Sequence, residues 1–386
     1  MDELANPYRP GAGTSPPALL GRDELIDHFG TTVRRALAGR PGKSVMPIGL
    51  RGVGKTVLLN RFAEIAEQEG LAVGFIEAPE SGDFRVLLVN RLRKILLAYD
   101  NDRKTAKVLK ALRVLKTFTL QLPDGSRFAI DVDALAGTAD SGDLSEDVTD
   151  LLLAAGEAAQ ERDSGLLLAV DEVQYLAAEE LAALITAIHR TTQQDLPVVL
   201  VGAGLPQLPG LAGDAKSYAE RLFEFPQIGS LERDDARAAI VVPAADRGVE
   251  LTDRAVGAII ERAQGYPYFL QEWGYHVWNA AGASPVEHDL VEAVTPRVVK
   301  HLDDNFFLVR FDRLTPAEKT YLRAMAELGP GPHRSGDIAG QLGVRVESVA
   351  PRRSGLISKG MVYSPAHGDT AFTVPLFDDF LRREMS

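Results

Sequence analysis

The chain contains no cysteine among its 386 residues. Disulfides are therefore excluded, and so are thiolate zinc sites and iron–sulfur clusters. Proteins without disulfides are typical of the reducing cytosol, so we expect a cytoplasmic protein. The seven histidines show no spacing typical of a metal site, and we interpret them as scattered surface and packing residues.

Long apolar runs and an excess of basic residues are also missing. No segment approaches the roughly 20 apolar residues that a membrane-spanning helix needs. The first residues, MDELANPYRPG, lack the apolar stretch of a signal peptide, so we expect no membrane association. The net charge is -12. A broadly basic surface for nucleic acid is therefore excluded, and DNA binding would need a local basic patch.

The order of helical and apolar segments predicts an α/β fold. Residues 1–18 are rich in Pro and Gly and predict an extended N-terminal arm. In residues 19–230, helical patterns alternate with apolar runs, which predicts a parallel sheet. The predicted strands are Ser44–Leu50, Leu71–Glu77, Gly165–Val170 and Pro197–Val201. We expect Pro47 near the start of its strand or at a bulge, because proline cannot donate a ladder hydrogen bond.

Residues 84–143 are interpreted as an insertion in this core. Helices are predicted at Phe84–Ala98 and Lys104–Leu115. Alternating apolar and polar residues at Thr117–Asp133 predict a hairpin around Pro123–Gly125. A helix is predicted at Leu144–Arg162, after the insertion.

The sequence pattern changes at residue 231 and again at residue 314. Residues 231–313 show only helical patterns. In residues 314–386 a helix capped by Thr315 is followed by two more, and then by a strand pair around His367-Gly368-Asp369. That order predicts a winged helix. Its third helix, Val346–Lys359, carries basic residues suited to duplex DNA, but the module holds nine Lys/Arg against eight Asp/Glu. Protein contact therefore stays open beside DNA contact for Arg345, Arg352, Arg353 and Lys359.

The sharpest motif is GLRGVGKT, which begins at Gly49 and fits G-x-x-x-x-G-K-[ST]. Its glycines let backbone N–H groups turn inward as an anion nest, and the following helix presents its positive end to phosphates. The lysine supplies a charge for the β- and γ-phosphates, and the threonine hydroxyl binds Mg²⁺. We therefore predict that ATP is contacted by Gly49, Arg51, Gly52, Val53, Gly54, Lys55, Thr56 and Val57.

A second motif, LLLAVDE, ends in Asp171 and Glu172. An apolar strand that ends in two acids places both carboxylates at the carboxyl edge of the sheet, beside the phosphate loop. We predict that Asp171 holds Mg²⁺ together with Thr56, and that Glu172 polarises the attacking water.

Together the motifs resemble those of the AAA+/STAND group of P-loop ATPases, near the archaeal-type ATPases and the Orc1/Cdc6-like module. The resemblance implies a P-loop sandwich, then a helical lid at 231–313, then a winged helix. It implies that Gly21 and Arg22, in Leu20-Gly21-Arg22, line the adenine pocket, and that Pro267 of Gly265-Tyr-Pro267 touches the adenine. Arg221 lies where such proteins carry an arginine finger, although an ordinary solvent-exposed arginine is at least as good an interpretation.

Two departures from that pattern stand out. Gly202-Ala203-Gly204 follows the fourth strand, where AAA+ proteins usually show a polar sensor residue, and the lid lacks a GxxR arginine. Both favour slow turnover, and thus a switch over a motor. The leading hypothesis is an ATP-hydrolysing switch that acts on a protein partner or by self-association. The alternatives are an Orc-like DNA-binding ATPase and a nucleotide binder with little hydrolysis.

Overall fold

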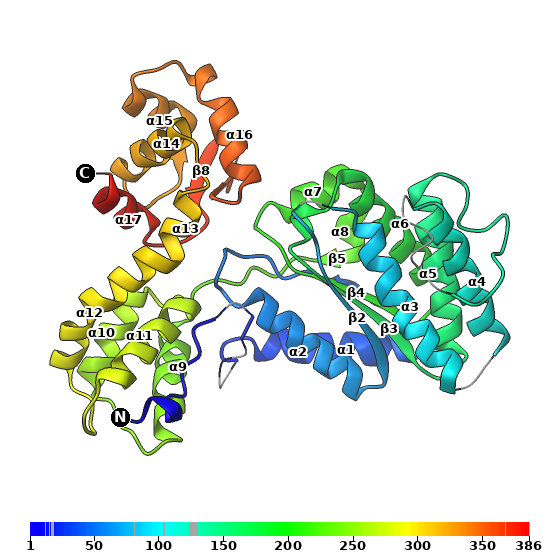
Figure 1. Cartoon of the computed structure of the whole chain (residues 1–386), viewed down its shortest axis with the longest axis horizontal. Helices are drawn as coiled ribbons and strands as arrows, with labels where there is room; N and C mark the ends of the chain where they lie inside the picture. Colours follow the sequence, from blue (N-terminus) through cyan, green and yellow to red (C-terminus); the bar gives the residue numbers. More distant parts are fainter. Residues whose placement is uncertain are drawn as a thin grey trace. The chain divides into compact units, whose positions relative to one another are not determined.

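A computed structural model describes residues 1–11, 13–14, 16, 19–80, 82–102, 105–122, 130–366 and 368–385 (Figure 1). The chain divides into two compact units. The first comprises Met1–Gly21, Gly49–Gly54 and Ile228–Ser386, and the second Arg22–Ile48 and Lys55–Gln227. Among the described residues, none of the helices has the length and apolar character needed to cross a membrane.

The second unit is built on a parallel sheet. Strands β2 (Leu71–Glu77), β3 (Gly165–Asp171) and β4 (Val198–Gly202) pair in that order. Strands β1 (Ser44–Val45) and β5 (Phe223–Glu224) pair with each other, and a bridge from Ile48 to Gly204 joins β1 to β4. The order is therefore β2-β3-β4-β1-β5. All seven residues of β3 are buried, as a strand covered on both faces requires.

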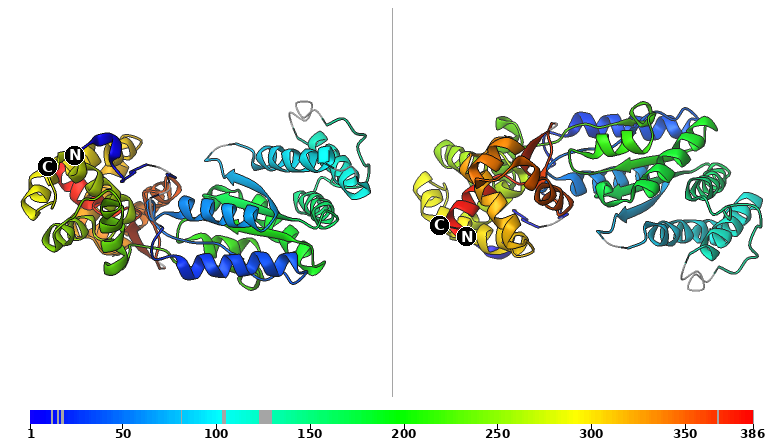
Figure 2. Two further views of the ribbon diagram at one scale, coloured as in Figure 1. Left: turned by 90° about the horizontal axis from the view of Figure 1, so that it is seen from below. Right: turned by 90° about the horizontal axis from the view of Figure 1, so that it is seen from above.

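Helices cover both faces of this sheet. Helices α1 (Asp23–Leu37) and α2 (Lys55–Gln68) lie on one face, and α5 (Leu144–Gln160) and α6 (Ala178–Gln193) lie on the other (Figure 1). Helices α3 (Phe84–Asp102) and α4 (Ala106–Leu120) pack beside α5, on the side away from α1 (Figure 2). Short helices α7 (Leu208–Ala215) and α8 (Ala219–Leu222) lead into β5.

Several sequence-based boundaries change in this unit. The first strand stops at Val45 and resumes as a single bridge at Ile48, so Pro47 interrupts it. The predicted hairpin is wrong in its first arm, because Thr117–Leu120 continues α4. Its turn, at 123–125, lies outside the described residues. Strand β5 and helices α7 and α8 were not predicted.

The first unit holds a run of helices: α9 (Arg233–Ala245), α10 (Asp253–Ala263), α11 (Pro267–Ala280) and α12 (His288–Leu302). A π-helical turn, Asp303–Phe307, leads from α12 into α13 (Leu308–Phe311). The N-terminal residues pack on these helices. The Tyr8 hydroxyl donates to the Ile240 carbonyl at 2.6 Å. Gly274 of α11 has no room for a side chain, since a Cβ there would lie 2.6 Å from the Tyr8 ring.

The C-terminal part of this unit has helices α14 (Pro316–Glu327), α15 (Ser335–Leu342), α16 (Ala350–Ser358) and α17 (Phe377–Glu384). A small antiparallel sheet has the order β6-β8-β7, formed by His333–Arg334, Asp369–Phe372 and Val362–Tyr363. The long helix predicted at Val346–Lys359 is instead a 3-10 turn, Val346–Ser348, followed by α16. Pro351 lacks an N–H and would break a helix interior, so it lies in the first turn of a new helix, which begins at Ala350.

Candidate functional site

The phosphate-loop sequence adopts the backbone that its glycines permit. Gly52 has φ +88° and Gly54 has φ +93°, both in the region that side chains rarely enter. A Cβ at Gly54 would meet nothing within 4 Å among the described residues. A Cβ at Gly49 would lie 2.3 Å from the Ile228 carbonyl oxygen. Gly54 is therefore required by its dihedral angle and Gly49 by close packing.

Helix α11 begins directly against this loop. The Tyr268 N–H donates to the Gly52 carbonyl at 3.2 Å. The Tyr266 hydroxyl donates to the Arg51 carbonyl. Pro267 occupies the first position of the helix between these two tyrosines, where its missing N–H costs nothing. The Gly265-Tyr-Pro267 element thus contacts the phosphate loop in the same compact unit.

The C-terminal module also reaches the loop, at Arg51. The Arg51 N–H donates to the Thr373 carbonyl at 3.4 Å. The Arg51 guanidinium lies over Gly360, where a Cβ would be 2.7 Å from Nη2. Gly360 has φ +63°, so both its backbone and its contact suit glycine. Two consecutive loop residues, Arg51 and Gly52, are therefore held by helix α11 and by the strand region of the C-terminal module.

In the second unit, Lys55 and Thr56 open α2 and face the end of β3. The Thr56 hydroxyl donates to Asp171 Oδ2 at 2.5 Å. Asp171 is 3% exposed, and burial raises its pKa, an effect that the Thr56 hydrogen bond and the Lys55 charge oppose. Lys55 itself is buried. The structure thus brings together the three residues predicted for phosphate charge and metal binding.

Glu172 has a strained backbone at this edge. Its φ of 53° and ψ of 41° are left-handed, which is uncommon for a residue with a side chain and is often found at functional sites. Its N–H donates to Asp171 Oδ1 at 2.9 Å. This left-handed residue lies directly after β3, where the strand ends.

Gln174 holds the Glu172 carboxylate and was not predicted from the sequence. Its side-chain Nε2 donates to Glu172 Oε2. Its Oε1 accepts from the Leu205 N–H at 3.0 Å, just beyond β4. One amide therefore bridges the ends of β3 and β4. The only signal in the sequence is a polar residue two positions after an acid, which is too common to single out.

This bridge explains the glycines that follow β4. A Cβ at Gly204 would lie 2.8 Å from the Gln174 Oε1 atom. A Cβ at Gly202 would lie 2.8 Å from a Val173 methyl group. Polar side chains are absent from 202–204 because residues after β3 fill the space beside them.

The remaining predicted residues are spread over both units. Gly21, with φ +68°, packs near Asp235 at the start of α9. Arg22 precedes α1 and caps it through its carbonyl, which accepts from the Ile26 N–H at 3.0 Å. Arg221 is exposed on α8. Val53 is buried in the loop and Val57 lies in the first turn of α2.

Two of the four basic residues considered for DNA or protein contact are engaged inside the C-terminal module. Arg353 donates to Thr370 Oγ1 and Ser364 Oγ, both at 2.7 Å. Lys359 pairs with Glu318 at 2.7 Å. Arg345 is exposed and Arg352 is half-buried. The basic surface available to a duplex is therefore smaller than the sequence suggested.

The parallel sheet, the phosphate-loop sequence before α2 and the acids that end β3 define a P-loop nucleotide-binding fold. Residues 18–201 match the AAA ATPase domain family. The chain therefore carries an AAA-type P-loop ATPase domain. Residues 304–381 match a domain of unknown function, DUF8462.

Three solved structures are distantly similar to this chain. The RuvB Holliday junction branch migration motor of Thermotoga maritima is 16% identical, with a TM-score of 0.47 over 92% of this chain and 94% of that one. The Aeropyrum pernix Orc1 protein in complex with DNA is 16% identical, with a TM-score of 0.46 over 96% and 94%. Cdc6p from Pyrobaculum aerophilum is 14% identical, with a TM-score of 0.46 over 100% and 99%. No curated protein matches.

Proposed function

We propose that this protein is an ATPase switch that binds ATP with Mg²⁺, hydrolyses it slowly, and acts on a protein partner. The observation that carries the proposal is the meeting of Thr56 and Asp171 at 2.5 Å, one residue from Glu172. Two oxygen ligands from a hydroxyl and a carboxylate are the donors that Mg²⁺ prefers. The residues present therefore fit this ion, which when bound neutralises charge on the phosphates.

Each side chain then has a separate task. The turned-in N–H groups of residues 49–54 and the start of α2 would cradle the phosphates. Lys55 would face the β- and γ-phosphates as a point charge. Glu172, held by Gln174, would accept a proton from the attacking water or orient it. Arg221 is exposed on α8, as an arginine finger for a neighbouring copy must be.

The contacts of the phosphate loop support a switch. Residues 51 and 52 are bonded to α11 and to the Thr373 carbonyl, so a phosphate that rearranges the loop would disturb both contacts. Movement of α11 and of the C-terminal module is then the output of the nucleotide state. We propose the boundaries 231–313 for the lid and 314–386 for a winged helix, on the element order given above.

The protein-partner function is preferred over DNA binding because Arg353 and Lys359 already have partners inside the module. Arg345 and Arg352 alone would bind a duplex weakly, since the affinity for DNA rises with the number of phosphates that basic residues neutralise. DNA binding stays the measurable alternative.

The deciding test is ATP turnover by the wild type and by Glu172→Gln, with and without duplex DNA, at low and moderate salt. We expect slow turnover that DNA does not change, and loss of turnover but not of ATP binding in the variant. Stimulation by DNA that fades with salt would establish the DNA-binding alternative instead. No turnover in either protein would remove hydrolysis from the proposal.

A further inference from the structure

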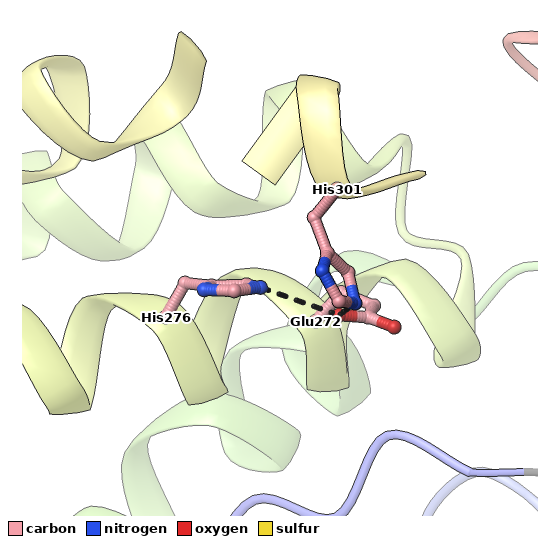
Figure 3. Close-up of side chains that lie close together, drawn as sticks. All are labelled: Glu272, His276 and His301. Carbon is pink, nitrogen blue, oxygen red and sulfur yellow. Dashed lines mark ion pairs between the residues drawn. The ribbon is translucent and has the colours of Figure 1, made fainter. Parts of the chain in front are cut away.

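A second cluster of ligand-type side chains lies in the helical part of the first unit. Glu272 and His276 are one turn apart on α11, and His301 comes from the last turn of α12 (Figure 3). Glu272 Oε2 lies 3.7 Å from His276 Nε2 and 3.8 Å from His301 Nε2. One ligand atom from each residue lies within 4.8 Å of the others. Since 25 positions separate the two histidines, their meeting is not visible in the sequence.

The cluster leaves buried polar atoms without partners. Glu272 is 2% exposed and His276 is 5% exposed. Within the described part of the chain, Glu272 Oε2 and both ring nitrogens of His276 have no hydrogen-bond partner. The distance between them is too long for a hydrogen bond. Burying such groups unpaired is costly, so an unseen ion or water between them is the usual explanation.

The chemistry of the three side chains favours a metal ion over a water. His276 is buried, and its imidazole nitrogens are of the kind that transition-metal ions bind. The Tyr268 hydroxyl donates to Glu272 Oε1 at 2.7 Å, which orients the carboxylate and leaves Oε2 directed at the histidines. A water could hydrogen-bond to the carboxylate, but a carboxylate oxygen and two imidazole nitrogens that converge on one point are the arrangement of a metal site.

We propose that Glu272, His276 and His301 bind a divalent transition-metal ion, with Zn²⁺ as the expected occupant. Two imidazoles and a carboxylate form a ligand set that Zn²⁺ uses, with a fourth position left open. Imidazole ligands disfavour Mg²⁺ and Ca²⁺, which take oxygen. Tetrahedral ligands at about 2.1 Å from zinc lie roughly 3.4 Å apart, so the 3.7 and 3.8 Å separations from Glu272 Oε2 need only a small contraction. His301, whose side chain is 43% exposed, can supply that movement.

The ion would clamp α11 to α12 close to the phosphate loop. Tyr268 donates its hydroxyl to the metal ligand Glu272 and its N–H to the Gly52 carbonyl. A π-helical turn begins at Asp303, two residues after His301, and such turns often mark functional sites in helices. Occupancy would therefore stiffen the helix that contacts the loop. Arg297, one turn before His301, is exposed, so solvent screens its opposing charge.

The test is a Co²⁺ titration followed by visible absorption, with Zn²⁺ as competitor. The protein is the full chain without an affinity tag, stripped of metal, free of nucleotide and kept in excess Mg²⁺. We expect one Co²⁺ per chain, the strong bands of a four-coordinate site, and displacement by Zn²⁺. His301→Gln, at an exposed position, should weaken binding by more than about 100-fold, beyond what loss of an outer-shell partner costs.

The matched control is His288→Gln on the same helix, because His288 is 42% exposed and His301 is 43% exposed. Binding should be unchanged in this control and in Asp171→Asn, which removes a carboxylate from the phosphate site. The proposal is overturned if the wild type binds no Co²⁺, if His301→Gln binds as tightly as the wild type, or if either control loses binding. None of these results depends on ATP turnover.

Discussion

The side-chain amide of Gln174 makes two hydrogen bonds, one with the Leu205 N–H and one with the Glu172 carboxylate, and substitutions can separate their effects. Gln174→Leu removes both hydrogen bonds while keeping a side chain of similar size. The Leu205 N–H then loses its acceptor at a residue that is 1% exposed. An unsatisfied buried N–H costs about 1–3 kcal/mol, so we expect the free energy of unfolding to fall by that amount.

The same substitution releases the Glu172 carboxylate. A hydrogen bond to a charged group contributes about 1.5–3 kcal/mol. If the bond holds Glu172 where the attacking water must lie, its loss should lower kcat by roughly 10- to 150-fold, since each 1.36 kcal/mol is tenfold in rate. The KM for ATP should change little, because Gln174 contacts neither phosphate-loop nor α2 residues in the described contacts.

Gln174→Glu provides the matched control. It keeps an oxygen to accept from the Leu205 N–H, but it cannot donate to Glu172 and places a like charge beside it. We expect stability near that of the wild type and kcat at least as low as that of Gln174→Leu. The assay is steady-state ATP turnover beside urea unfolding. Wild-type kcat in Gln174→Glu, with Glu172→Gln inactive, would refute a positioning role for Gln174.

Three further outcomes follow from single residues. Thr56→Ser should keep Mg²⁺-dependent turnover while Thr56→Val loses it, measured by turnover against Mg²⁺ concentration; equal activity would remove the hydroxyl from metal binding. Gly52→Ala should lower the urea midpoint more than Gly54→Ala, because both strain a positive φ but only a Cβ at Gly52 would press on Tyr266 and Tyr268, at 3.1 and 3.2 Å. Burial opposes ionisation of Glu318, but hydrogen bonds from Lys359 and Thr315 outweigh it and lower its pKa. A lowered pKa means that ionised Glu318 stabilises the folded state. This contribution is present above the usual Glu pKa and is lost as pH falls below it, so Glu318→Gln should flatten the decline of Tm with acid.

The sheet was predictable because its strands are apolar on both faces. Gly165–Val170 and Leu71–Glu77 were expected from their composition, and the structure gives Gly165–Asp171 and Leu71–Glu77. The alternation at Thr117–Leu120 misled because both Thr117 and Thr119 are buried, at 3% and 0% exposure. Their hydroxyls donate to carbonyls of their own helix, which lets β-branched residues continue α4. An alternation of apolar and polar residues predicts a strand only where the polar residues are exposed to solvent.

The candidate site was predictable where its residues belong to local sequence motifs. Lys55, Thr56, Asp171 and Glu172 each belong to a motif with its own spacing, and the structure brings Thr56 and Asp171 into contact. The cluster at Glu272 was not predictable, because its third member comes from another helix. Contacts of that kind depend on how α11 and α12 pack, which no local pattern records.

The absence of a polar residue at 202–204 has a different meaning once Gln174 is located. From the sequence, that absence favoured slow turnover, because AAA+ proteins usually show a polar sensor residue at this position. The structure places the Gln174 amide there, from the 3-10 turn Val173–Tyr175 that follows β3, and Gly204 is small because this amide lies 2.8 Å from where a Cβ would be. Gln174 thus supplies a polar contact beside Glu172 that the sequence did not reveal. The expectation of slow hydrolysis then rests on the missing GxxR arginine, and Gln174→Leu measures how much this amide contributes.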